Sequence, residues 1–284
     1  MKVRRFRIER SDIHGESAIL EGDAAHYVRS VLRLRQGQIV ELFDGDGNEW
    51  VGPIERLEKH VVQVRIEQHH FTAPREEGPR VILLFSLARG SHTDLAIQKV
   101  TELGVSEVRL FTSERTVAVP RPGGDPVRID RLERIATDAA RQAGRAHVPP
   151  VRAPEPFRDV LDALAGGETR LVLWEGEHQT SLASALGEWD QAKPLVMLVG
   201  PEGGFTRDEV EIATGEGFVP VHVGPFILRT ETAAIAAVAA ARILFPEGDG
   251  PGGRPREVGG TARGSSGEGD ADDDGPESAE VVVD

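Results

Sequence analysis

The stretch that most limits what this chain can fold into is residues 195–210, LVMLVGPEGGFTRDEV. Its first five residues are apolar, the length of a strand buried on both faces, and they lead into Gly200 and Pro201. Thr206 and Glu209 then have the spacing of a capping box at a helix start. A strand, a glycine-rich turn and a helix place bare backbone where open α/β folds bind ligands. A tight connector that binds nothing gives the same pattern.

A second loop of this kind occupies residues 223–234, VGPFILRTETAA. It also joins a strand end to Gly-Pro and then to a helix. Two such loops could line one cleft with backbone N–H and C=O groups, which suit an adenosine ligand recognised edge-on. Neither loop has the G-x-G-x-x-G spacing or the lysine of a phosphate-binding loop, which disfavours a nucleotide-binding enzyme acting on small molecules. No His, Asp or Glu grouping has metal-ligand spacing, so we expect no metal.

Strand and helix patterns alternate through the larger part of the chain. Strands are predicted at 81–87, 108–111, 171–174, 195–199 and 219–223, and helices at 94–103 with Asp94 as cap, 128–142 and 231–244. Such alternation predicts an α/β fold, a mostly parallel sheet with helices on both faces.

Residues 1–72 instead read as short strands interrupted by one helix at 24–34, which predicts a small β-barrel. Its arginines are not balanced by nearby acids, so we expect contacts with RNA phosphates, although a solvated face would look the same. The arginines concerned are Arg4, Arg5, Arg7, Arg29, Arg33 and Arg35.

The charge of −14 is concentrated at the end of the chain. Residues 247–284 hold 11 acids and three arginines, a net of −8, which leaves −6 for the rest. This composition predicts a disordered acidic tail at 247–284, after a barrel at 1–73 and an α/β domain at 74–246. The chain has no cysteine and no apolar run of membrane length, so we expect a soluble cytoplasmic protein that binds no membrane.

Several blocks of the sequence, in the same order, resemble the RsmE family of 16S ribosomal RNA uracil-N3 methyltransferases in the SPOUT superfamily. The resemblance covers residues 1–246. It rests on both Gly-Pro loops and on residues 97–104, 113–115, 141–145 with Pro149, His26, 31–33 and 44–45. Two positions depart from the family pattern: Phe226 stands where an arginine is usual, and a lysine is usual near His92.

The resemblance implies an N-terminal PUA-like RNA-binding barrel and a SPOUT-type knotted sheet that binds S-adenosylmethionine (SAM). It also implies a homodimer that methylates 16S rRNA or the small ribosomal subunit. By motif position the SAM cleft comprises Leu173, Trp174, Gly200, Glu202, Gly203, Gly204, Val223, Gly224, Ile227, Leu228 and Ala233. Arg115 and Arg145 lie in matching blocks and join the expected RNA contacts. A non-catalytic RNA-binding or ribosome-assembly factor is the alternative.

Two residues are candidates for catalysis in such an enzyme. Uracil N3 presents a lone pair to the methyl group only as its proton leaves, so the site needs a base or a means of stabilising an anion. Glu202 is a candidate base or a partner of the ligand's amino group, and it could equally cap the helix. Arg229 is a candidate for stabilising the anion, and its structural alternatives are an ion pair with Glu231 or a contact with a backbone carbonyl of the knot that the resemblance implies.

Overall fold

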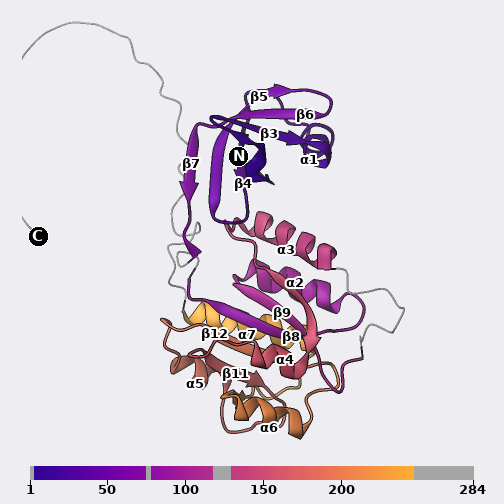
Figure 1. Cartoon of the computed structure of the whole chain (residues 1–284), viewed down its shortest axis with the longest axis vertical. Coiled ribbons are helices and arrows are strands. Elements are labelled where there is room, and N and C mark those ends of the chain that lie inside the picture. Colours follow the sequence, from indigo (N-terminus) through magenta and orange to yellow (C-terminus); the bar gives the residue numbers. More distant parts are fainter. Residues whose placement is uncertain (1–2, 75–77, 118–128, 246–284) are drawn as a thin grey trace, which may run out of the picture. The chain divides into compact units, whose positions relative to one another are not determined.

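The computed structural model describes residues 3–74, 78–117 and 129–245 (Figure 1). The expected acidic tail lies outside these residues.

The N-terminal part is a curled mixed sheet, in keeping with the predicted PUA-like barrel. Its strands are β1 Arg4–Arg7, β2 Ile13–His14, β3 Ser17–Glu21, β4 Ile39–Phe43, β5 Asn48–Leu57, β6 Val61–Arg65 and β7 Gln68–Phe71. The strand order is β1-β4-β5-β6-β3-β2, with β7 paired to β5. Only β1 and β4 pair in parallel among these strands. Phe6, Leu42 and Ile54 lie in its apolar core.

The helical segment of this sheet is irregular. A 3-10 turn, η1, covers Arg10–Asp12, and α1 covers only Gly22–His26 before the chain continues as the π-helical turn η2, Tyr27–Val31. The predicted helix at 24–34 is therefore present but shorter and wider than expected. Ala25 and Val28 on its inner side are buried, which anchors the segment.

The larger part is a parallel sheet between two layers of helices. Its strands are β8 Val81–Ser86, β9 Glu107–Thr112, β10 Val151–Pro156, β11 Thr169–Leu173, β12 Leu195–Val199 and β13 Val219–Val221, in the order β10-β9-β8-β12-β11-β13. The helices are α2 His92–Glu102, α3 Ile129–Ala143, α4 Phe157–Asp162, α5 Leu182–Gly187, α6 Arg207–Gly215 and α7 Thr230–Leu244. The strands of this sheet pair in parallel throughout the described residues, as the alternating pattern predicts.

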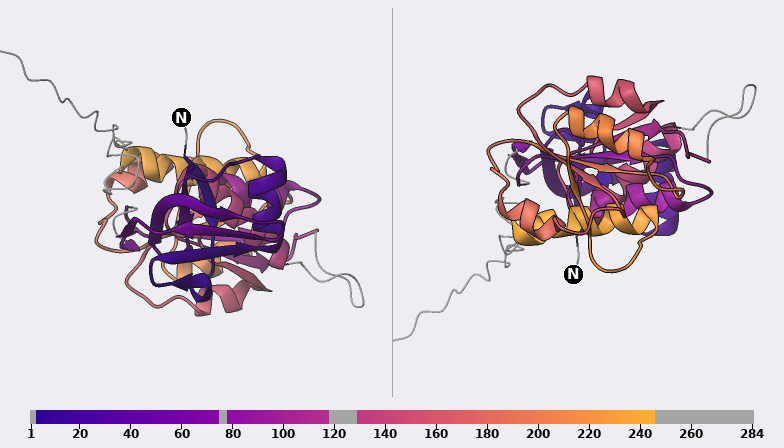
Figure 2. Two further views of the ribbon diagram at one scale, coloured as in Figure 1. Left: turned by 90° about the horizontal axis from the view of Figure 1, so that it is seen from above. Right: turned by 90° about the horizontal axis from the view of Figure 1, so that it is seen from below.

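Each face of the sheet has its own apolar core. Residues of α2, α3, α5 and α7 pack on the face that carries Leu83 and Met197, whereas α4 and α6 pack on the face that carries Leu84 and Leu198. Viewed from below in Figure 2, α7 and α6 lie on opposite sides of the strands. β12 is buried along its whole length, which accounts for its uninterrupted apolar sequence.

Several local predictions need correction. Ser91, not Asp94, is the N-cap position of α2, and Asp94 in the first turn pairs with Arg131 instead. The strands β7 and β10 and the short helices α4 and α5 were not predicted. The capping box of Thr206 and Glu209 at the start of α6 is confirmed. None of the described helices has the length and apolarity needed to cross a membrane.

Candidate functional site

A cavity of about 530 Å³ opens at the carboxyl ends of β11, β12 and β13, within the usual range for small-molecule sites. Because β11 lies between β12 and β13, the loops that follow these strands meet there. The lining residues are Leu173, Trp174, Glu175, Glu177, His178, Val199, Gly200, Pro201, Gly204, Phe205, Val221, His222, Val223, Gly224, Pro225, Phe226, Ile227, Leu228, Thr230 and Ala233.

The structure thus brings both Gly-Pro loops to one cavity. Every residue assigned to the SAM cleft from the sequence lines it, except Glu202 and Gly203. These two belong to the same turn but stand outside the lining. The sequence missed Glu175, Glu177 and His178, which follow β11 in a loop without any apolar periodicity.

Two glycines let backbone form the cavity wall. A Cβ at Gly204 would lie 2.2 Å from Oε1 of Glu175, and the φ of Gly204 is +69°. A Cβ at Gly200 would lie 2.9 Å from the ring of Phe205. A side chain at either position would collide with a residue that itself lines the cavity, so glycine keeps the turn packed closely against Glu175 and Phe205. The cavity's size and its largely apolar lining fit the adenosine part of SAM.

Neighbouring loops hold the turn of residues 200–204 in place. The Oε1 of Glu202 accepts a hydrogen bond from the backbone N–H of Arg89 at 2.7 Å. The Arg115 guanidinium donates to the carbonyl oxygen of Gly203 at 3.2 Å. The Glu209 carboxylate caps α6 and also accepts the N–H of Glu114 at 2.9 Å. The turn is therefore fixed by contacts outside its own strand and helix.

Glu175 and Glu177 give the cavity an acidic wall. Glu177 accepts hydrogen bonds from the backbone N–H groups of Gln179 and Thr180, at 2.6 and 3.0 Å. The bond from Thr180, followed by that from Gln179, holds the pKa of Glu177 below its usual value. Among the described residues that line the cavity, none is Lys or Arg. His178 and His222 line the cavity as well, and His178 adds to the lowering of the Glu177 pKa. The wall therefore carries two carboxylates and two histidines, with no lysine or arginine beside them.

The second Gly-Pro loop presents exposed side chains at the cavity mouth. Phe226 is 80% exposed and Ile227 is 87% exposed. Arg229 is the exposed N-cap residue of α7, and Glu231 pairs with His92 at 2.7 Å. One alternative role of Arg229, an ion pair with Glu231, is absent from the interactions of the described residues. His92, at the position where the family usually has a lysine nearby, thus contacts the start of the helix that follows this loop.

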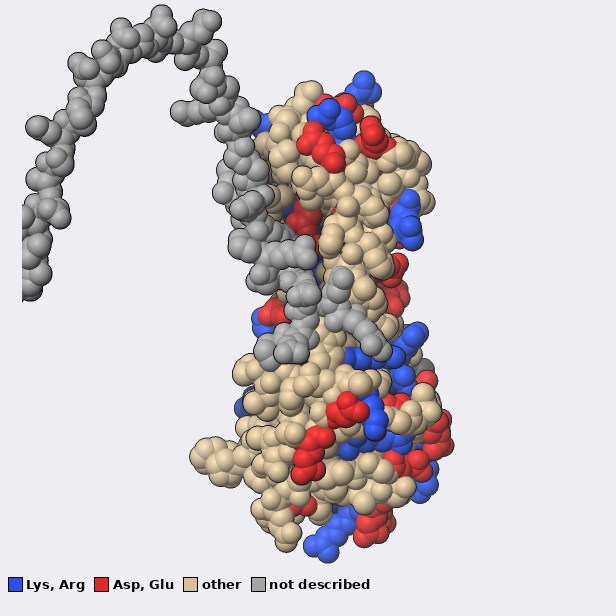
Figure 3. Space-filling model, turned by 90° about the vertical axis from the view of Figure 1, so that its left-hand side faces the viewer, with Lys and Arg blue, Asp and Glu red and all other residues tan. Residues whose placement is uncertain are grey.

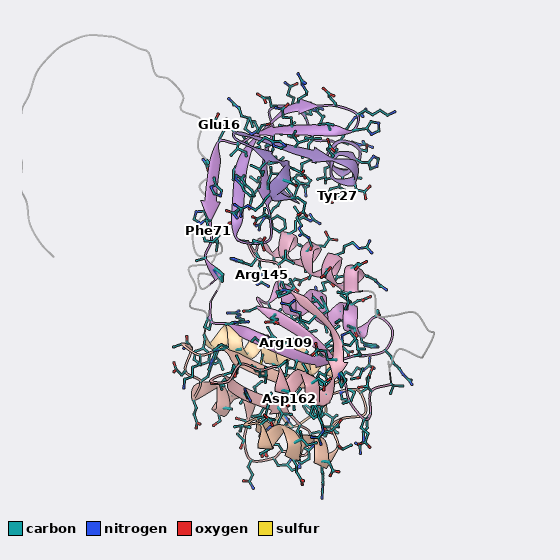
Figure 4. All side chains as sticks on the ribbon, in the orientation of Figure 1. Glu16, Tyr27, Phe71, Arg109, Arg145 and Asp162 are labelled. Atoms are coloured by element: carbon teal, nitrogen blue, oxygen red, sulfur yellow. The ribbon has the colours of Figure 1, made fainter. Side chains whose placement is uncertain are left out.

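The predicted RNA-contacting arginines fall into two groups. The exposed group comprises Arg4, Arg7, Arg29, Arg33, Arg35 and Arg115, and Arg33 has an unusual φ of +52° just after η2. Labelled Tyr27 marks the start of η2 in Figure 4. On the face shown in Figure 3, Lys and Arg are interspersed with Asp and Glu, so the charge there is mixed rather than uniformly basic.

Arg5 and Arg145 are placed differently from what the sequence suggested. Arg5 is buried between Glu41 and Glu49, at 3.2 and 2.7 Å, with its guanidinium over the ring of Phe43. Arg145 is buried just beyond α3 and donates to the carbonyl oxygen of Thr101 (Figure 4). In this structure neither guanidinium is presented on the surface, so these two predictions are corrected to structural roles.

Comparisons with known proteins agree with this arrangement. A family model described as an RNA methyltransferase domain matches residues 75–242, and one described as an RNA methyltransferase PUA domain matches residues 20–67. The ribosomal RNA small subunit methyltransferase E of Mycobacterium tuberculosis is 32% identical over 245 residues, covering 83% of this chain and 89% of that protein. The protein of the same name from Synechocystis is 33% identical over 224 residues, covering 78% of this chain and 71% of that protein.

The chain belongs to the ribosomal RNA small subunit methyltransferase E family.

Two solved structures with bound SAM support the same assignment. The Neisseria gonorrhoeae enzyme, determined with bound SAM, matches with a TM-score of 0.71 at 30% identity, covering 86% of this chain and 98% of that chain. A Legionella pneumophila protein in complex with SAM matches with a TM-score of 0.75 at 28% identity, with the same two coverages. Membership of the family favours an rRNA methyltransferase over the non-catalytic RNA-binding factor. The trefoil knot that the resemblance implies stays a prediction.

Proposed function

We propose that the protein transfers the methyl group of SAM to N3 of a uridine in 16S rRNA. The observation that carries this proposal is the single cavity that both Gly-Pro loops line at the ends of β11, β12 and β13. SAM-bound relatives of the same fold support SAM as the ligand of this cavity.

The residues around the cavity have distinct proposed roles. Bound SAM would supply an electrophilic methyl group, and the chain must orient the uracil and help remove its N3 proton. Glu202 is the proposed proton acceptor; its carboxylate is held by the N–H of Arg89 and is exposed beside the cavity. Arg229, exposed at the start of α7, is proposed to stabilise the negative charge that develops on O2 or O4.

Substitution separates these catalytic roles from SAM binding. Glu202→Gln keeps the acceptor for Arg89 but removes the base, and Arg229→Gln removes the positive charge. We expect each variant to lose about 100-fold or more in kcat while SAM affinity changes less than about threefold. Single-turnover methyl transfer and calorimetry measure the two quantities. An unchanged kcat for both variants contradicts the assignment.

Exposed arginines of both domains are proposed to position the RNA. Arg7, Arg29 and Arg33 of the barrel and Arg115 of the larger domain would contact phosphates, which adds affinity without reading sequence. We place the barrel at residues 1–73 and the methyltransferase domain at 74–246, with the small ribosomal subunit as substrate in the cytoplasm. Neutralising Arg29 and Arg33 together should reduce RNA affinity and its dependence on salt.

A homodimer is part of the proposal. Ile243 in the last turn of α7 is 75% exposed and the adjacent Leu244 is also exposed, although the rest of the helix is rich in buried alanines. Large apolar side chains gathered at one helix end are typical of a surface that a partner covers. Sedimentation of the wild type should give a dimer, and Ile243→Glu should shift it toward monomer.

Methyl transfer from labelled SAM tests the proposed function. Undermethylated small subunits and naked 16S rRNA serve as substrates, with reactions lacking RNA as control. The enzyme should label RNA; a non-catalytic assembly factor would bind subunits without labelling them. Turnover without RNA would instead indicate a small-molecule enzyme.

A further inference from the structure

The acidic wall of the cavity has no role in the function proposed above. Glu175 and Glu177 line the cavity, yet neither is the proposed base. Among the described residues neither carboxylate forms an ion pair with a lysine or arginine, and the one charged neighbour that lowers the pKa of Glu177 is His178. Acidic groups in a binding site favour a ligand that carries positive charge.

The two carboxylates have different surroundings. Oε1 of Glu175 lies so close to the backbone of Gly204 that a Cβ there would approach to 2.2 Å. Glu177 is fixed by two backbone N–H groups, and these same bonds lower its pKa. Gly176 between them allows the loop to pass the Trp174 ring, because a Cβ there would lie 2.4 Å from that ring. The loop thus places both acidic residues on the lining of one cavity.

Methyl transfer changes the charge of the donor and little else. SAM carries a sulfonium, an ammonium and a carboxylate; when the carbon–sulfur bond to the methyl group breaks, its electron pair stays on sulfur and the product is a neutral thioether. S-adenosylhomocysteine (SAH) keeps the adenosine and the amino-acid groups. The backbone of the Gly-Pro loops therefore contacts the same adenosine in both ligands. A fixed negative charge, in contrast, is attracted to the sulfonium of SAM and finds no such charge on the sulfur of SAH.

We propose that Glu175 and Glu177 make the cavity select the cationic donor SAM over its neutral product SAH. This inference rests on the proposed function, since it assumes that SAM occupies the cavity. The two carboxylates attract the sulfonium, and that attraction disappears when the methyl group has been transferred. The wall thereby favours release of the product and its replacement by fresh donor.

Calorimetry with two ligands tests the proposal. SAM and SAH are titrated at one mildly alkaline pH into the wild type, the double variant Glu175→Gln/Glu177→Gln and the control Glu188→Gln. Glutamine keeps the size of each side chain and, at position 177, the acceptor for the two N–H groups. Glu188 is exposed at the end of α5 and does not line the cavity, so its variant removes one charge from outside the site.

In the double variant the ratio of SAM affinity to SAH affinity should fall by about tenfold, the size expected from nearby charges at a partly solvated site. Glu188→Gln should keep the wild-type preference. Sinefungin carries an amine in place of the sulfonium. Its affinity should therefore fall in the double variant as the affinity for SAM does.

Other outcomes identify which part of the account fails. If the double variant weakens SAM and SAH equally, the carboxylates bind the shared ammonium and the inference is overturned. An unchanged preference in every variant also overturns it while leaving the proposed function intact. Failure of the wild type to bind either ligand contradicts the proposed function itself. Melting temperatures check that each variant is folded.

Discussion

Gly204 shows at the scale of one residue why the turn after β12 contains glycine. Its φ of +69° is strained for any residue with a Cβ, and that Cβ would meet the Glu175 carboxylate. Gly215, within α6, has neither a positive φ nor any atom within 4 Å of a Cβ built there. The same substitution should therefore have opposite consequences at the two positions.

Gly204→Ala should weaken SAM binding by about tenfold or more and destabilise the fold by about 1–2 kcal/mol. The reason is that the turn must shift or Glu175 must leave its place on the wall. Gly215→Ala, the matched control, should bind SAM normally and be as stable as the wild type or more so. Calorimetry and chemical denaturation measure both effects. Equal SAM affinity in the two variants contradicts the placement of Gly204 on the cavity wall.

At the scale of elements, the start of α6 also binds a loop that comes from another strand. Glu209 completes the capping box with Thr206 and accepts the N–H of Glu114 from the loop after β9. One buried carboxylate thus ties the helix start to a loop from another strand. Local sequence shows only the first of these two functions.

Glu209→Ala should cost about 2–3 kcal/mol of folding free energy, because it removes a cap and leaves the N–H of Glu114 without this acceptor. Glu211→Ala, at an exposed position of the same helix, should change stability by less than about 0.5 kcal/mol. Urea denaturation compares them. If the two variants are equally stable, Glu209 does not hold the turn.

The elements that sequence reasoning found and missed differ in physical terms. β12 was found because a strand buried on both faces must be apolar throughout. β10 was missed because Pro154 and Pro156 suggest a loop, yet β10 is an edge strand, where proline is tolerated. The six residues of α5 are too few for a helical period to be recognised.

The sequence predicted the parts of the candidate site that are formed by backbone, and it missed most of the parts that are formed by side chains. Gly200 and Gly224 were recognised because Gly-Pro at a strand end implies a turn with accessible backbone. Glu175 was not recognised, because the sequence does not indicate the direction in which an acidic side chain in a loop points. Arg5 was assigned to RNA because its partners, Glu41 and Glu49, come from strands that the sequence alone does not bring beside it.

At the scale of the whole molecule, buried carboxylates respond to pH in opposite directions. In the barrel, burial raises the pKa of Glu49, more than the attraction of Arg5 lowers it, and the nearby Glu41 raises it further. In the parallel sheet, burial also raises the pKa of Glu107, but hydrogen bonds and attraction from Arg109 and Arg80 together bring it below the usual 4.5. Glu107 therefore favours folding when ionised, whereas ionisation of Glu49 opposes it.

Glu107→Gln should reduce stability at neutral pH by about 1–2 kcal/mol. The contribution of Glu107 is present above the ordinary pKa of 4.5 and is lost as pH falls through its lowered value, so the variant should approach the wild type in acid. Glu49→Gln should show the reverse trend: between 4.5 and the raised pKa, wild-type stability declines with rising pH and the variant's declines less. Thermal unfolding across the acid range measures these slopes, and parallel curves for all three proteins contradict the assignment.

The most direct test of the central claim is the identity of the methylated nucleoside. Undermethylated small subunits are incubated with SAM and the wild type or Gly224→Val, whose β-branched side chain would sit at a φ of +154° in the second Gly-Pro loop. The RNA is then digested and its nucleosides are separated by mass spectrometry. The account predicts 3-methyluridine from the wild type and none from Gly224→Val. A methyl group on any other nucleoside, or none with the wild type, contradicts it.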